Sequence, residues 1–592
     1  MRHHLAAILP KNDESDTIRE SSSTSDTRVP STSEDLTLNK SGNDFKSEFH
    51  WTTVLNSATG PIGHEVEPDE RKTRDGQSPH MSQTVLLFEC GTTPSRQELI
   101  AGLPSRKICD GLVTSYFRIF NYNCFVHAGE FLKNYRRFWD APESTSISWL
   151  ALLYSAMCLA VQFKSPCLHD SITDQRSEPC CQDLLFELRE KTVHCLIRAQ
   201  YGNGGPFVME TLLHYLTTEN YLRPDANTGL WLLLGTIVQI AIRMGYHRDP
   251  RHFKSLSPYE GEMRRRVWAH CCIFDVVLAT QLGLPTIIKS STCDTLPPAN
   301  VSDKDYDATS TSLPPVRPDE EITQCSVTIA KYWLAQALSK VSDALSSLCS
   351  YSLDDAMRID EGLQDAMRRL PDLLQHRSLS ESILDSRLIV FQRINIRLAY
   401  LRGRILLHWK FAAMLKGSAD YDASRRILVD SAVESLELQH LAVDELRTDH
   451  YLAPKYLYDS AIVNHTYLLA TSVLCFHIRY QSSMVAPEIM DRIRTLLRGT
   501  QVIWQRSSKS SAEARRAADA LGTVLDGLRD CASAPNATPI SQVNRGAFNS
   551  FQLPFTFCST NFDDLPQPFL GDGDAFLYTS AELSMDPWGT FV

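Results

Sequence analysis

The sequence predicts an all-α protein in which a multi-helix domain lies between a disordered polar N-terminal arm and an acidic-aromatic C-terminal tail. Three observations support this fold class. Apolar residues recur at helical spacing through most of the chain after residue 103. No segment alternates apolar and polar residues over a long stretch, so no sheet is expected. The 592 residues are 43% hydrophobic and 22% charged, which is typical of a globular protein with polar segments attached.

The expected arm, residues 1–80, is polar and low in complexity. Serine and threonine dominate residues 21–27 and 30–33. Such a composition buries too little apolar surface to offset the entropy lost on ordering, so we expect disorder. The apolar run at residues 5–9 is shorter than the core of a secretory signal peptide. No stretch approaches the length of a continuous apolar membrane span, so we expect no membrane contact and a location in the cytosol or nucleus.

Helical periodicity continues through the rest of the chain and is broken by segments that favour loops. These are a glycine-rich run at residues 202–206 and a linker rich in Ser, Thr and Pro at residues 308–318. Apart from the pair described next, helices are expected over residues 112–120, 149–161, 184–199, 209–222, 320–351, 353–374, 386–415, 423–446, 456–480, 487–505 and 512–531.

A helix pair within residues 229–307 has the clearest start and stop signals. Its first helix, over residues 229–245, follows the capping residues Asn227 and Thr228. Gly245 closes this helix, because glycine is the residue that most often ends one.

The second helix of the pair begins after Ser257. The Ser257 hydroxyl can accept a first-turn amide bond, Pro258 needs no amide donor, and Glu260 completes a capping box. Gly283 and Pro285 end the helix. Its apolar residues are spaced by three or four positions and predict one core-facing stripe. They are Met263, Val267, Cys271, Phe274, Leu278 and Leu282.

The tail, residues 532–592, has a composition unlike that of the helical region. From residue 546 onward it has no Lys or Arg, and acidic residues are interleaved with aromatic ones. The acidic residues keep such a segment solvated while its aromatic side chains stay available to a partner. The tail is therefore a candidate binding segment.

No metal ligand and no cofactor is expected. The 16 cysteines are scattered without any C-x-x-C pair, so we expect reduced, mostly buried thiols. His247 and His252 have no third ligand nearby in the sequence. Asp303 starts a segment similar to a calcium loop, but Ala308 and Pro314 occupy the positions that need Gly and Glu.

No catalytic residue is expected either. The His-Arg-Asp triplet at residues 247–249 repeats a kinase motif, but Lys254 stands where the metal-binding Asn should be, and no glycine-rich loop precedes it. An all-α biosynthetic enzyme would need spaced carboxylate clusters, and the acid pair at residues 354–355 lacks a third carboxylate. We therefore expect no enzymatic activity. An all-α biosynthetic enzyme is the alternative function.

Three consecutive arginines, Arg264, Arg265 and Arg266, allow two interpretations. They could contact phosphate groups, or they could form a solvated face in which Glu262 pairs with Arg265 or Arg266. On a helix they fan out over about 200° of the circumference, so we favour the salt-bridged face, which also braces the preceding turn. The net charge of -11 argues against a chain whose whole surface binds DNA.

Taken in order, these motifs resemble the fungal-specific transcription factor domain, the middle regulatory region of fungal zinc-cluster regulators. They include GYHRDP at residues 245–250, EMRRRVW at 262–268 and LGLP at 282–285. Residues 112–131 and 397–408 are similar to earlier and later parts of the same domain. The motif residues are Gly245, His247, Arg248, Asp249, Pro250, Glu262, Arg265, Arg266, Trp268, Asp275, Gly283 and Pro285.

The resemblance implies an all-α regulatory domain over residues 103–480, followed by C-terminal helices over residues 481–531. It implies a nuclear protein that controls transcription, and we expect an activator of a fungal gene set such as a secondary-metabolite biosynthetic gene cluster. The motif residues then serve folding and regulation. The tail suits an activation segment that contacts the transcription machinery. The resemblance leaves both a homodimer and a heterodimer open.

The sequence departs from this family at its N-terminal side. Members normally bind promoter DNA through a zinc cluster of six cysteines, whereas the first cysteine here is Cys90. One explanation is that the chain has no DNA-binding module of its own and acts as a co-regulator through a zinc-cluster partner. The other is that the gene model has lost a 5′ exon, in which case the chain binds DNA directly and zinc is a cofactor.

Overall fold

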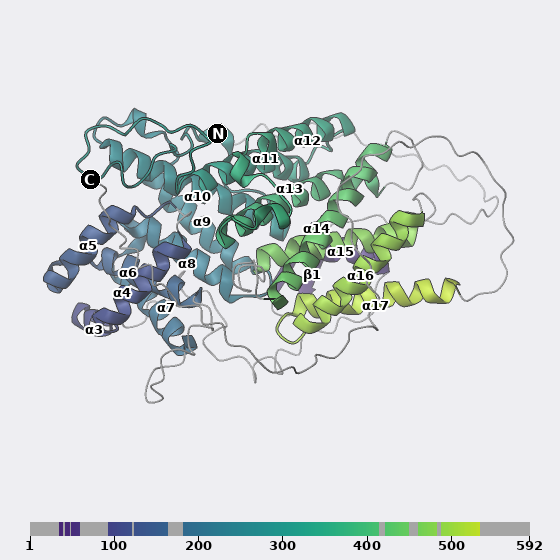
Figure 1. Cartoon of the computed structure of the whole chain (residues 1–592), viewed down its shortest axis with the longest axis horizontal. Coiled ribbons are helices and arrows are strands. Elements are labelled where there is room, and N and C mark those ends of the chain that lie inside the picture. The colour runs from purple at the N-terminus through teal and green to yellow at the C-terminus, as the bar shows by residue number, and fades with distance from the viewer. Residues whose placement is uncertain are drawn as a thin grey trace, which may run out of the picture. The chain divides into compact units, whose positions relative to one another are not determined.

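Helices make up nearly all of the regular secondary structure in the computed structural model (Figure 1). The structure describes residues 35–39, 42–47, 49–59, 93–120, 124–163, 181–413, 421–448, 460–481 and 487–532. These residues belong to one unit, which ends at Ser533. The expected tail beyond Ala532 and much of the expected arm lie outside the described residues.

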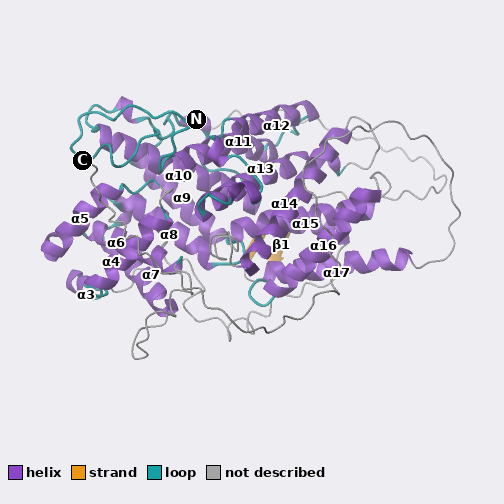
Figure 2. Cartoon of the chain, in the orientation of Figure 1, coloured by secondary structure: helices purple, strands orange, loops and turns teal. Residues whose placement is uncertain are grey.

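The all-α fold class is confirmed, and the structure has a helix within each range that the sequence predicts, together with helices over residues 96–101 and 128–140 that the sequence did not predict. Figure 2 shows the helices in purple around a single short orange hairpin. The described α-helices are α1 Trp51–Thr59, α3 Arg96–Ala101, α4 Arg106–Ile119, α5 Ala128–Asp140, α6 Ile147–Gln162, α7 Cys181–Arg198, α8 Val208–Leu222, α9 Thr228–Arg243, α10 Pro258–Leu282, α11 Ser326–Ser346, α12 Leu353–Arg368, α13 Arg387–Ala412, α14 Asp422–Thr448, α15 Ala461–Gln481, α16 Pro487–Ser507 and α17 Ala512–Ala532.

A β-hairpin lies inside the segment that we expected to be a disordered arm. Strand β1, Asp35–Asn39, pairs antiparallel with β2, Gly42–Lys46, so that Asp35 lies opposite Lys46. The expectation that the chain forms no sheet is therefore wrong at this place. Each strand has five residues, which is too short for an alternating pattern to stand out from the surrounding polar sequence.

Helix α1 also lies within the expected arm. It packs against α15 and α17, and Trp51, Val54, Leu55 and Ala58 are buried there. The expectation of disorder is wrong for these residues as well. The apolar cluster is short, and it is stabilised by helices about four hundred residues later in the chain, so the local composition gives no indication of its burial.

Helix α6 forms the centre of the N-terminal half of the helical region. It contacts α4, α7 and α8, which Figure 1 shows around it. From Trp149 to Val161 every residue is buried, because a helix that is apolar on all sides is stable only when other helices surround it. The sequence predicted this helix but not the number of its neighbours.

Helix α15 has the same role in the C-terminal half. It packs against α1, α10, α13, α14 and α17. Among the described helices, α15 alone has the length and hydropathy of a membrane span, but 89% of its most apolar window is buried within the fold. Such burial is typical of the central helix of a packed core.

The helix pair α9 and α10 begins and ends where the sequence predicts. Asn227 caps α9, and Ser257 and Glu260 form both hydrogen bonds of a capping box at the start of α10. Gly283 ends α10 with a φ of 67°, a left-handed conformation that glycine adopts without steric cost. The apolar residues expected to face the core are buried, apart from the half-buried Phe274, but α10 is buried on nearly all sides and not along one stripe alone. Its core-facing positions include charged residues.

Two buried histidines make the stability of this fold depend on pH. His214 lies between the Tyr116 hydroxyl, 2.8 Å from Nε2, and the Ser155 hydroxyl, 2.9 Å from Nδ1. Burial lowers the pKa of His214 to about 3 and that of His270 to about 4. Both side chains are therefore neutral in the folded chain at pH values where the unfolded chain has protonated them.

We expect the folded state to lose stability as the pH falls from about 6.5 towards 4. The unfolded chain binds these protons first, so each histidine contributes at most about 1.4 kcal/mol per pH unit in this window. Urea unfolding at a series of pH values measures the slope. The variant His214→Gln should show a shallower slope than the unaltered chain, and an identical slope would contradict the assignment.

Candidate functional site

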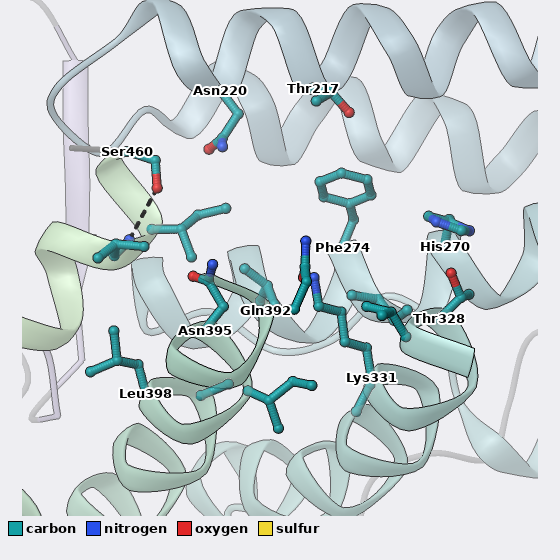
Figure 3. A pocket seen from close by; sticks show the side chains of 18 of the residues that line it. Thr217, Asn220, His270, Phe274, Thr328, Lys331, Gln392, Asn395, Leu398 and Ser460 are labelled. Atoms are coloured by element: carbon teal, nitrogen blue, oxygen red, sulfur yellow. Dashed lines mark hydrogen bonds between the residues drawn. The ribbon is translucent and has the colours of Figure 1, made fainter. Parts of the chain in front are cut away.

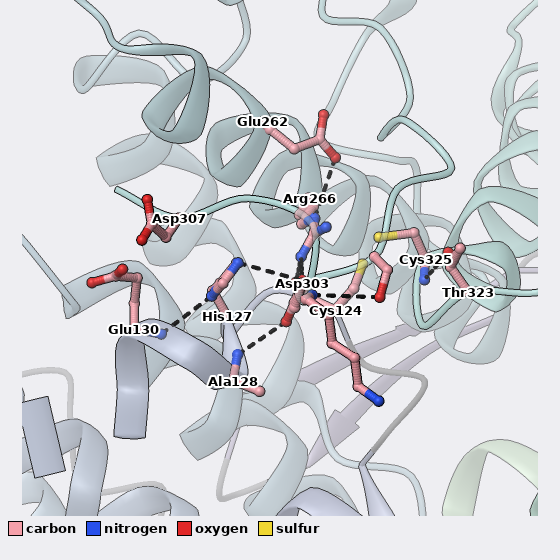
Figure 4. Close-up of polar contacts among 12 residues, drawn as sticks. Cys124, His127, Ala128, Glu130, Glu262, Arg266, Asp303, Asp307, Thr323 and Cys325 are labelled. Atoms are coloured by element: carbon pink, nitrogen blue, oxygen red, sulfur yellow. Dashed lines mark hydrogen bonds and ion pairs between the residues drawn. The ribbon is translucent and has the colours of Figure 1, made fainter. Parts of the chain in front are cut away.

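Most of the motif residues lie around the N-terminal half of α10, where Arg266 is fully buried. Its Nε donates to Glu262 Oε1 at 3.2 Å, one helical turn earlier. Its Nη1 donates to Asp303 Oδ1 at 2.6 Å and to the backbone oxygen of Cys124 at 3.1 Å. Figure 4 shows Arg266 between Glu262 and Asp303. One guanidinium therefore joins α10, the loop after it and the segment before α5.

Asp303 extends this network to the start of α5. Its Oδ2 accepts a hydrogen bond from the backbone amide of Ala128 at 2.9 Å, and its Oδ1 lies 3.8 Å from His127 Nε2. His127 Nδ1 in turn accepts from the backbone amide of Glu130 at 3.2 Å and caps α5. The carboxylate thus fixes the beginning of a helix that lies far from it in the sequence.

Burial and charge act in opposite directions on these groups. Burial alone would raise the pKa of Asp303, but Arg266 and His127 hold that pKa below its usual value. For Glu262, burial outweighs the attraction of Arg266, and its pKa is raised. Burial lowers the pKa of His127. The stable arrangement at neutral pH is a charged Arg266–Asp303 pair beside a neutral histidine.

Asp249 is the centre of a second network, on the loop between α9 and α10. Arg265 binds it through two parallel bonds, Nη2 to Oδ1 at 2.9 Å and Nε to Oδ2 at 3.0 Å. The backbone amides of Arg251 and Leu296 donate to the same carboxylate at 3.1 and 3.0 Å. Its side chain is fully buried. Burial would raise the pKa of Asp249, but Arg265 and these amides lower it.

Two further carboxylates hold loops in the same way. Asp294 accepts from the backbone amide of Asp249 at 2.9 Å and contacts Arg248 and His252 at the surface. Asp275 accepts from the amides of Ile287 and Ile288 at 3.0 and 2.7 Å. Burial raises the pKa of Asp275 to about 6. Asp294 joins the long loop that follows α10 to the loop between α9 and α10, and Asp275 joins that long loop to α10 itself.

The three consecutive arginines of α10 all form contacts with other groups of this protein. Arg264 donates to the backbone oxygen of Met244 at 2.8 Å, and its guanidinium lies 4.6 Å from the ring centre of Tyr246. Arg265 and Arg266 make the ion pairs described above. The favoured salt-bridged interpretation is confirmed, and Glu262 pairs with Arg266. The expectation of a solvated face is wrong for Arg266, whose side chain has no exposed surface.

The remaining motif residues shape the chain around these networks. Gly245 ends the turn after α9 with a φ of 80°, and Pro250 is buried at the first position of a short 3-10 helix. Trp268 is buried in the core, with its ring 6.4 Å from that of His247. Pro285 is exposed in the loop after α10. The structure thus brings together most of the predicted motif and leaves Gly283, at the C-terminal end of α10, and Pro285 outside the networks.

Sequence reasoning missed the role of some residues in these networks. Asp303 appeared only as the start of an imperfect calcium loop, and it is the main acidic partner of Arg266. Asp294 and Cys124 were not considered as partners at all. The available signal was weak, because 37 residues separate Asp303 from Arg266 and 142 separate Cys124 from it.

Within the described part of the chain, no group of three or more His, Cys, Asp or Glu residues is arranged to hold a metal ion. The described cysteines are free thiols, and most are buried, as the sequence predicted, although Cys349 is exposed. The polar atoms of the two networks bind mainly one another and nearby backbone groups. Their arrangement fixes loops against α10.

Comparisons with known proteins indicate the family of this chain. Residues 113–358, from α4 into α12, match the family model described as the fungal specific transcription factor domain. The fusarisetin A cluster transcription factor of Fusarium sp. (strain FN080326) is 32% identical over 93% of this chain and 74% of that protein. The equisetin cluster transcription factor of Fusarium heterosporum is 33% identical over 82% of this chain and 71% of that protein.

A third relative, the pyrrolocin cluster transcription factor of Fungal sp. (strain NRRL 50135), is 34% identical over 84% of this chain and 67% of that protein.

The fold and these matches define the class of the protein, which is a fungal transcription regulator with an all-α domain. The chain belongs to the family of fungal transcription factors that carry the fungal specific transcription factor domain. The resemblance inferred from the sequence is confirmed. The boundary predicted at residue 480 stays a prediction.

Proposed function

We propose that this protein activates transcription of a biosynthetic gene cluster for a fungal secondary metabolite and that it acts in the nucleus. The observation that carries the proposal is the 32% identity over 93% of the chain to a regulator named for such a cluster. The equisetin and pyrrolocin regulators, also named for clusters, support it. The motif residues then hold the regulatory domain together.

For promoter binding, we propose a zinc cluster as the DNA-reading element. Two relatives, from Macrophomina phaseolina and Monascus ruber, are named as Zn(2)-C6 fungal-type transcription factors. Either residues encoded upstream of this sequence supply the cluster, with zinc as cofactor, or a partner chain supplies it through a heterodimer. Mapping the 5′ end of the transcript distinguishes direct binding from binding through a partner.

We further propose that the tail, residues 532–592, forms the activation segment. From residue 546 onward the tail contains aromatic and acidic residues and no Lys or Arg, which favours contact with basic and apolar surfaces of the transcription machinery. Membership of a transcription factor family supports a role without catalysis. Turnover of a prenyl diphosphate with magnesium by the purified chain would contradict that part of the proposal.

Deletion of the gene tests the central part of the proposal. RNA sequencing of the deletion strain should show a strong loss of transcripts from one contiguous biosynthetic cluster, because its activator is missing. Reintroduction of the gene should restore those transcripts, and a fluorescent fusion of the protein should accumulate in the nucleus. Unchanged transcripts across the genome would refute the proposal.

A further inference from the structure

A cavity of about 200 Å³ lies between helices from both halves of the fold. Residues of α8, α10, α11, α13 and α15 line it, and most of them are apolar. Figure 3 shows Thr217 and Asn220 on one side and Lys331 reaching towards them from the opposite side. A cavity of roughly 150 Å³ is enough to hold benzene, so this one suits a small organic molecule.

Two cations line the cavity, and no Asp or Glu does. Burial lowers the pKa of Lys331 to about 8 and that of Arg402 to about 10. Both side chains remain charged at neutral pH. No ion pair is formed by either residue within the part of the chain that the structure describes. An uncompensated buried charge is costly unless a ligand of opposite charge binds it.

Arg402 differs from the other buried arginines among the described residues. Its side chain is only 1% exposed, and its Nε and Nη1 have no hydrogen-bond partner among those residues. Each of the others pairs with a carboxylate: Arg189 with Glu219, Arg266 with Glu262 and Asp303, Arg393 with Asp385, and Arg425 with Asp422. Among the described residues, every other buried arginine therefore has an acidic partner, and Arg402 has none.

Two amide oxygens of the cavity also lack partners among the described residues. They are Asn220 Oδ1 on α8 and Gln392 Oε1 on α13. Each can accept a hydrogen bond from a hydroxyl or amide group of a ligand. The cavity thus offers apolar walls, two cations and two acceptors, which is typical of a small-molecule site.

We propose that this cavity binds a small, largely apolar organic carboxylate, whose anionic group pairs with Lys331 and Arg402. Its apolar part packs against the walls formed by residues such as Phe274 and Leu334. The inference rests on the proposed function, since such a ligand makes the regulator responsive to a metabolite. Acyl and aryl carboxylates share this chemistry.

The cavity lies next to the network around Arg266, so a bound ligand can act on that network. His270 lines the cavity, and its Nδ1 lies 2.8 Å from the backbone oxygen of Arg266. Helices α11 and α13 each contribute a cation, and α8 and α15 complete the wall. A bound anion therefore stabilises the arrangement in which these helices are packed together, and it shifts the population towards that arrangement.

The test is isothermal titration calorimetry on the purified full chain at neutral pH. The probes are hexanoate, octanoate, decanoate, benzoate and phenylbutyrate, each compared with its neutral amide. We expect at least one carboxylate to bind at least 10-fold more tightly than its amide, because only the anion compensates the charges of the buried Arg402 and the half-buried Lys331. The straight-chain and aryl probes distinguish a lipid-like from an aromatic ligand.

The variants Arg402→Met and Lys331→Met should each weaken binding of that carboxylate at least 10-fold and leave binding of the amide nearly unchanged. Lys340→Met, at an exposed position of the same helix as Lys331, is the matched control and should bind as the unaltered chain does.

Without ligand, Arg402→Met should melt at the same or a higher temperature, because it removes an unpaired buried charge. Arg393→Met, which breaks a buried pair, should melt lower. Should Arg402→Met fail to fold, Lys331→Met carries the test.

Equal affinity for carboxylate and amide, no binding of any carboxylate, or undiminished binding by Lys331→Met would each overturn the proposal. Calorimetry on the purified chain does not depend on transcription. A chain that binds the carboxylate while its deletion leaves all transcripts unchanged would therefore refute only the proposed function. Loss of cluster transcripts without carboxylate binding would refute only the ligand site.

Discussion

Replacing Arg266 with methionine lowers the free energy of unfolding by about 3–5 kcal/mol, because it leaves two buried carboxylates without their cation. Glu262 has no exposed side-chain surface and Asp303 is 9% exposed, so water cannot replace the guanidinium at either place. The Cys124 carbonyl loses a donor as well. Urea unfolding followed by tryptophan fluorescence measures the change, since Trp268 lies on the same helix.

A matched control separates this effect from the general loss of an arginine. Arg358 on α12 pairs with Asp355 at the surface, and its side chain is 75% exposed. Exposed pairs of this kind contribute little to stability, so Arg358→Met should unfold at nearly the same urea concentration as the unaltered chain. Equal sensitivity of the two variants would contradict the role of burial at Arg266.

Replacing Asp249 with alanine is expected to have the second largest effect, a loss of about 2–3 kcal/mol in the free energy of unfolding. The change removes the acceptor of the paired Arg265 bonds and of two backbone amides. Arg265 is 21% exposed and Leu296 is 43% exposed, so water partly compensates the loss of their bonds to Asp249. Urea unfolding measures the change.

Asp294→Ala is the control for this prediction. Asp294 also accepts from a backbone amide and contacts the side chains of Arg248 and His252, but it is 38% exposed. Its partners stay hydrated after the substitution, and we expect a clearly smaller shift of the unfolding midpoint. A shift as large as that of Asp249→Ala would show that burial is not what gives Asp249 its importance.

The sequence predicted the parts of this fold that depend on neighbouring residues. The start of α10 at Ser257 and Glu260 and its end at Gly283 are local signals, since the capping groups lie within a few residues of the backbone groups that they satisfy. The structure reproduces both ends. Helix α9 was predicted for the same reason.

Contacts between distant segments could not be predicted in this way. Helix α1 is buried by α15 and α17, and Arg266 finds Asp303 across a long loop. The cavity takes Lys331 from α11 and Arg402 from α13. None of these pairs has a spacing that a helical or extended period would reveal. The resemblance identified the motif residues, but only the structure showed which partners hold them.

The motif residues hold the regulatory domain together through buried networks, and the network around Arg266 depends on its ion pair with Asp303. A double-mutant cycle of Arg266→Met and Asp303→Asn in the full chain tests it most directly, with the free energy of unfolding as the measured quantity. If the two residues act through their ion pair, the double variant loses less than the sum of the single losses, with a coupling energy of about 1–3 kcal/mol. Losses that add within about 0.5 kcal/mol would contradict the claim.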